Sequence, residues 1–173
     1  LLDKDGKAIS FADADRFQRA VHLKDIHLER GMQCIDCHTE SDVHGDGFLY
    51  TAMIDAVEIG CIDCHGTYTE RATLETSGAA AGPHSMKNTR TPFGAKQFQK
   101  KGGKLLQRSK VTDGLEWEIP QLVDALDPAS PSFNPRAARA MGMKREDGSF
   151  THDPGKMECY ACHSSWTTSC GGC

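Results

Sequence analysis

The chain has 173 residues and a net charge of -4, with 38% hydrophobic and only 7% aromatic residues. A core made of polypeptide alone would be thin at this composition, so we expect another source of buried apolar surface. The mild negative charge argues against a nucleic-acid-binding protein, which needs a basic face. No apolar run approaches the roughly 20 residues that span a bilayer, so no transmembrane segment is expected.

The first third of the chain is predicted to form a hairpin, a helix and two cysteine motifs. Within residues 1–11, apolar and polar residues alternate on both sides of a turn at Asp5-Gly6, which predicts a β-hairpin. Residues 10–31 carry an apolar stripe behind Ser10 as a candidate N-cap, and Gly31 ends the predicted helix. The pattern CIDCH follows at 34–38 and returns at 61–65.

Residues 66–158 contain no further motif of this kind and are expected to be a separate insert. Alternation on both sides of Gly102-Gly103 predicts a second hairpin. EWEIPQL predicts an edge strand ending at Pro120, and NPRAARAM predicts a short helix with Pro135 at its first position. The organisation is thus expected to be 1–65, 66–158 and 159–173, with CYACH opening the last part.

The cysteines share one spacing. All eight fall into C-x-x-C pairs, which a disulfide framework would rarely do. Three pairs are followed at once by a histidine, and C-x-x-C-H attaches c-type haem through two thioethers and a proximal iron ligand. Zinc remains the competing interpretation, although it does not require that histidine. The residues are Cys34, Cys37 and His38, then Cys61, Cys64 and His65, then Cys159, Cys162 and His163, and finally Cys170 and Cys173.

The sequence stops on CGGC, and it opens without an initiator methionine or a signal peptide. Both ends are therefore expected to be cut, and CGGC is interpreted as a fourth haem motif whose histidine would be residue 174. A degenerate tail is the alternative. Because Cys162 and Cys170 are only eight positions apart, the third and fourth haems are expected to lie close together.

Five further histidines are candidates for the distal iron position. Their number nearly matches four haems and suggests iron with histidine on both faces. Methionine is the competing axial ligand, but it more often fills gaps in a core. The candidate distal histidines are His22, His27, His44, His84 and His152, and the methionines are Met32, Met53, Met86, Met141, Met143 and Met157.

The sequence resembles the large multihaem c-type cytochromes of metal-reducing and related prokaryotes. The resemblance rests on HLERGMQCIDCHTESDVHGDG, AVEIGCIDCHGTYTERATL and KMECYACHSSWTTSCGGC, and TPFGAKQFQKKGGKLLQRS and GLEWEIPQL look like the haem-free insert of such proteins. It implies a mostly irregular fold, with few short helices and small β-hairpins wrapped around stacked haems. It also implies secreted or outer-surface proteins with low-spin, bis-histidine haems, some of which form filaments.

The expected function is electron transfer by an extracellular, outer-surface or periplasmic protein that is not an enzyme. Haem propionates would add negative charge, which favours cationic partners, metal ions or mineral surfaces besides other cytochromes and redox proteins. One alternative is a fragment of a multihaem nitrite, hydroxylamine or sulfur-oxyanion reductase with an open-coordinate haem. A subunit of a self-assembled filament is a refinement of the first interpretation.

Overall fold

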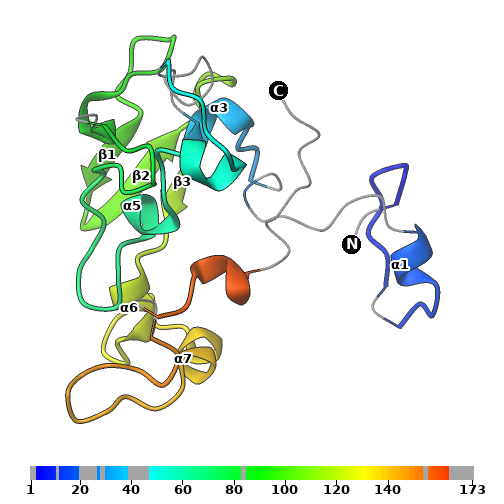
Figure 1. Cartoon of the computed structure of the whole chain (residues 1–173), viewed down its shortest axis with the longest axis vertical. Coiled ribbons are helices and arrows are strands. Elements are labelled where there is room, and N and C mark those ends of the chain that lie inside the picture. Colours follow the sequence, from blue (N-terminus) through cyan, green and yellow to red (C-terminus); the bar gives the residue numbers. More distant parts are fainter. Residues whose placement is uncertain are drawn as a thin grey trace. The chain divides into compact units, whose positions relative to one another are not determined.

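Figure 1 shows the computed structural model of the chain. It describes residues 3–10, 12–19, 27, 30–38, 47–82, 85–153 and 156–163. The chain divides into two compact units, one formed by Leu1–Met32 with Glu158–Cys173 and the other by Gln33–Met157. These boundaries differ from the expected 1–65, 66–158 and 159–173, because the second unit contains the first two cysteine motifs together with nearly all of the expected insert.

A three-stranded antiparallel sheet organises the second unit. The strands are β1 (Phe98–Lys101), β2 (Lys104–Arg108) and β3 (Glu116–Ile119), in the order β1-β2-β3. Gly102 and Gly103 connect β1 to β2 with φ values of 58° and 80°, as a two-residue hairpin turn of this hand requires. The predicted hairpin and the predicted edge strand before Pro120 are both confirmed.

The two faces of this sheet differ because successive side chains of a strand point to opposite sides. One face is buried, and we call it the inner face. The other carries the ion pairs Lys104–Glu118 and Arg108–Glu116 and is largely exposed. The inner face consists of Phe98, Leu105, Gln107, Trp117 and Ile119.

The second unit also contains short helices. They are α3 (Cys34–Cys37), η1 (Met53–Ala56), α5 (Cys61–His65), η2 (Met86–Asn88), α6 (Leu122–Leu126) and α7 (Pro135–Met141). The predicted helix α7 is confirmed, and α6, which the sequence had not indicated, packs beside it (Figure 1).

The start and end of α7 follow directly from its sequence. The Asn134 carboxamide oxygen accepts hydrogen bonds from the backbone N–H groups of Arg136 and Ala137. Pro135 occupies the first turn, where its missing N–H costs nothing. Gly142, with φ of 78°, ends the helix.

The first unit contains α1 (Arg16–Arg19) and η3 (Cys159–Ala161). The predicted turn at Asp5-Gly6 is present, since the Gly6 N–H donates to the Asp3 carbonyl at 3.0 Å. Of the helix predicted over 10–31, residues 11, 20–26 and 28–29 lie outside the described residues. None of the helices in the described part of the chain has the length and apolar character needed to cross a membrane.

Candidate haem-attachment sites

The first two C-x-x-C-H motifs each form one turn of α-helix. In α3 the backbone N–H of His38 donates to the Cys34 carbonyl at 2.8 Å, and in α5 the whole motif is helical. Residues three and four apart share one face of a helix, so the two cysteines and the histidine of a motif lie on the same face. This arrangement suits haem c, which needs two thiols and one imidazole on the same side.

The residue before the second cysteine, an aspartate in both of these motifs, secures the turn. The Asp36 carboxylate accepts from the backbone N–H of Gln33 at 2.8 Å and from that of Lys110 at 2.6 Å. The Asp63 carboxylate accepts from the N–H groups of Gly60 at 2.7 Å and Ser77 at 3.0 Å. Both carboxylates therefore cap the start of a motif helix and tie it to a distant segment.

The third motif, CYACH, has no such aspartate. Ala161 stands at that position and offers no acceptor, and the motif forms only the 3-10 turn η3. The N–H of His163 still donates to the Cys159 carbonyl at 3.0 Å, so the two cysteines and the histidine again share one turn. The difference between the motifs thus follows from a single residue type.

The inner face of the sheet holds the first motif helix. The side-chain amides of Gln97 and Gln107 both donate to the Asp36 backbone carbonyl, at 2.9 and 2.6 Å. The Trp117 indole N–H donates in turn to the Gln107 carboxamide oxygen at 3.2 Å. Both glutamines are 2% exposed or less, and a buried network in which each polar atom is paired fixes its members rigidly.

The end of β3 holds the second motif helix. Nδ1 of His65 lies 2.8 Å from the Pro120 carbonyl oxygen. A carbonyl only accepts, so Nδ1 carries the proton and Nε2 keeps a lone pair that could ligate iron. Gln121 donates to the Cys64 carbonyl at 2.9 Å and accepts from the Ala72 N–H at 2.8 Å. The segment without attachment motifs is therefore the scaffold for both sites.

The two motif helices are also neighbours. Burial and, to a smaller extent, charge repulsion from the nearby Cys37 and Asp63 raise the pKa of the Cys64 thiol to about 12. The charge effect of Cys37 on Cys64 indicates that the second cysteines of the two motifs lie near one another.

Among the candidate distal ligands, His152 is the best described. Its Nδ1 lies 2.6 Å from the Ala140 carbonyl oxygen, which fixes the proton on Nδ1 as in His65. His27 uses its backbone carbonyl to accept from the N–H groups of Arg30 and Met32. Five predicted site residues lie outside the described residues, namely His22, His44, His84, Cys170 and Cys173.

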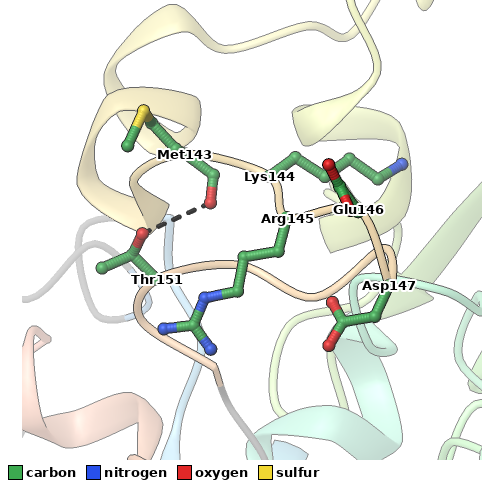
Figure 2. Close-up of a pocket in the computed structure, with 6 residues that line it drawn as sticks. All are labelled: Met143, Lys144, Arg145, Glu146, Asp147 and Thr151. Atoms are coloured by element: carbon green, nitrogen blue, oxygen red, sulfur yellow. Dashed lines mark hydrogen bonds between the residues drawn. The ribbon is translucent and has the colours of Figure 1, made fainter.

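A pocket of about 750 Å3 is lined by residues from the segment 143–151, which ends just before His152 in the sequence. The pocket is open to one side. In Figure 2 the Arg145 side chain lies between Thr151 and Asp147, and the Thr151 hydroxyl donates to the Met143 carbonyl at 3.3 Å. Two cationic and two anionic side chains line the pocket. It contains none of the attachment cysteines and does not include His152. The lining residues are Met143, Lys144, Arg145, Glu146, Asp147 and Thr151.

Two alternatives from the sequence can be weighed on this geometry. Within the described residues, no three side chains of His, Cys, Asp or Glu form a metal-binding group, so the zinc interpretation gains no support. Met32 and Met86 are 7% and 3% exposed, which fits a core role rather than axial ligation.

The sequence interpretation missed Asp36, Asp63 and the anchoring glutamines. The available signal for Asp36 and Asp63 was that CIDCH occurs twice with an aspartate directly before the second cysteine.

Removal of one anchoring glutamine should loosen the second site. Gln121→Ala leaves the Ala72 N–H and the Cys64 carbonyl without this buried partner. We expect a loss of about 2 kcal/mol in the free energy of unfolding of the holoprotein, measured by urea denaturation. Asn88→Ala, which removes an exposed carboxamide in η2, should change it by about 0.5 kcal/mol or less. Equal stability of the two variants would contradict the anchoring role.

Part of the chain matches a known protein family. Residues 4–66 match the family described as cytochrome c554 and c-prime. The match covers about a third of the chain and includes the first two complete C-x-x-C-H motifs. The chain has no significant match among curated proteins or among solved structures.

Proposed function

We propose that this c-type cytochrome, an electron-transfer protein whose cofactor is haem c, carries electrons through several closely spaced haems. Three complete C-x-x-C-H motifs and the terminal CGGC support four haems. The five remaining histidines support histidine on both faces of each iron, and covalent haem attachment favours a periplasmic, outer-surface or extracellular location.

One observation carries the proposal most directly: two attachment helices are anchored on the same scaffold, the segment that carries the sheet and Gln121. Gln107 holds the first and Gln121 holds the second, and each contacts a backbone carbonyl inside its motif. Rigid anchoring suits electron transfer, because the protein then need not rearrange when an electron arrives. A site built for catalysis would instead need polar groups over an open face.

The residues of the chain perform three tasks in this account. The cysteines hold the cofactor covalently, so that it cannot dissociate from a chain with a thin core. The Pro120 carbonyl orients His65 and leaves Nε2 to the iron. His152, with Nδ1 held by Ala140, presents Nε2 as a distal ligand in the same way. Bound haem supplies one-electron Fe(III)/Fe(II) chemistry, at low potential when both axial ligands are histidine.

The haem count tests the proposal. Intact-mass analysis and a pyridine haemochrome assay should both show several covalent haems per chain, and Cys61→Ser/Cys64→Ser should give one haem fewer than the unaltered protein. Loss of one haem from that variant, with the others kept, would show that the second motif attaches its own cofactor. Absence of covalent haem from the unaltered protein would refute the proposal and favour zinc at the C-x-x-C pairs.

A further inference from the structure

The charges of the chain are strongly segregated. Residues 76–112, which we call the basic segment, contain eight lysines and arginines and no aspartate or glutamate. The rest of the chain has 12 basic and 24 acidic residues. The net charge of -4 therefore conceals a basic segment inside an acidic protein, and the two regions attract different partners.

Much of this positive charge lies on the surface without an internal partner. Lys87, Lys104 and Arg108 form ion pairs with glutamates. In contrast, the described part of the chain places no carboxylate within ion-pair distance of four other lysines or of Arg90, and the Arg90 guanidinium donates only to a backbone carbonyl. The four lysines are Lys96, Lys100, Lys101 and Lys110.

Several of these cations face one another across paired backbone. Lys101 lies opposite Lys104 in the β1–β2 hairpin, and Arg90 lies opposite Lys96 in an isolated bridge. Like charges in such positions destabilise the pairing. The stability of the fold therefore does not explain this arrangement, whereas a need for concentrated positive charge at the surface does.

The basic segment also borders the first haem-attachment helix. The Lys110 N–H donates to the Asp36 carboxylate, and Gln97, next to Lys96, donates to the Asp36 carbonyl. The Arg108 guanidinium donates to the Lys96 backbone carbonyl, so Lys96 lies beside the end of β2. Positive charge thus lies beside the first site, while the acidic residues belong to other segments.

We propose that this surface, formed by Arg90, Lys96, Lys100, Lys101 and Lys110, docks an acidic redox protein that exchanges electrons with the haem of the first motif. The inference rests on the proposed function and adds a partner class to it. With haem bound at the first motif, one electron would pass from the reduced centre of the partner to Fe(III), which would become Fe(II). The overall negative charge predicts cationic partners, and this surface predicts an anionic one at the first attachment site.

A stopped-flow experiment on the holoprotein tests the proposal. The anionic donor is a reduced plant-type [2Fe–2S] ferredoxin, and the cationic donor is the methyl viologen radical. The variant is Lys96→Gln/Lys100→Gln/Lys101→Gln, whose three lysines are exposed. The control, Lys4→Gln/Lys7→Gln/Arg136→Gln, removes the same charge from exposed positions outside the basic segment. Haem reduction is followed at about 10 mM and about 200 mM ionic strength.

We expect the variant to lower the rate constant with ferredoxin about 10-fold at low ionic strength and less than about 2-fold at high ionic strength. The control should remain within about 2-fold of the unaltered protein, and the viologen rate should not fall in either. Equal slowing by variant and control would refute a local docking surface. Slowing with both donors would refute it as well, because the lysines would then act on the haem itself, for instance through its propionates.

Failure of the proposed function has a different signature. In that case neither donor would reduce the haems of the unaltered protein to the six-coordinate, low-spin spectrum. Normal reduction by both donors, with no difference among the three proteins, would leave the electron-transfer function intact and refute the docking surface alone.

Discussion

Asp36→Ala is expected to destabilise the holoprotein by about 3–5 kcal/mol. The substitution removes two charge-assisted hydrogen bonds and leaves the N–H groups of Gln33 and Lys110 without their acceptor. Because Asp36 is 2% exposed, water cannot easily replace the carboxylate. Urea denaturation followed by circular dichroism measures the loss.

Matched variants separate this role from a general effect of losing a carboxylate. Asp63→Ala removes the same kind of cap from the second motif and should cost a similar amount. Asp55→Ala removes an exposed carboxylate in η1 and should change the free energy of unfolding by about 0.5 kcal/mol or less. If all three variants are equally stable, the motif aspartates do not secure the attachment helices.

His152→Ala is expected to open one haem to carbon monoxide. If the Nε2 of His152 ligates an iron, its removal leaves that iron five-coordinate in the reduced protein. On addition of carbon monoxide, the part of the Soret absorbance that one haem contributes should then shift. The unaltered protein should show no shift. The exposed hydrogen bond to Ala140 contributes little to folding, so the variant should stay folded.

Two further variants keep this test specific. His152→Met should restore six-coordination and raise the potential of that haem, because methionine replaces histidine as axial ligand. Thr151→Ala, at the exposed neighbouring position, should behave as the unaltered protein does. A carbon monoxide spectrum of His152→Ala that matches the unaltered protein would remove His152 from the distal ligands.

Local features of the fold could be predicted from the sequence because local chemistry determines them. The Gly102-Gly103 turn, the end of β3 at Pro120 and the start of α7 at Asn134-Pro135 each depend on the backbone preferences of one or two residues. The structure bears out all three. In contrast, α6 lacks such a signal, since Gln121 makes no side-chain cap for it and instead reaches Cys64.

The candidate sites were predicted only in part. The motif spacing identifies the attachment residues, because one helical turn places both thiols and the histidine on the side that would face the haem. The anchors could not be predicted in this way, because Gln107 and Asp36 are 71 positions apart and only the folded sheet brings them together. The wrapping of the chain around stacked haems and the choice of distal histidines remain predictions, since both depend on cofactor surfaces as much as on the polypeptide.

The central claim is that every iron is six-coordinate and therefore carries electrons without binding substrate. The most direct test is the visible spectrum of the dithionite-reduced, haem-quantified protein before and after addition of carbon monoxide. The account predicts a low-spin c-type spectrum that does not change. A shift corresponding to one haem or more would contradict it, because an open iron position would point to a multihaem reductase instead.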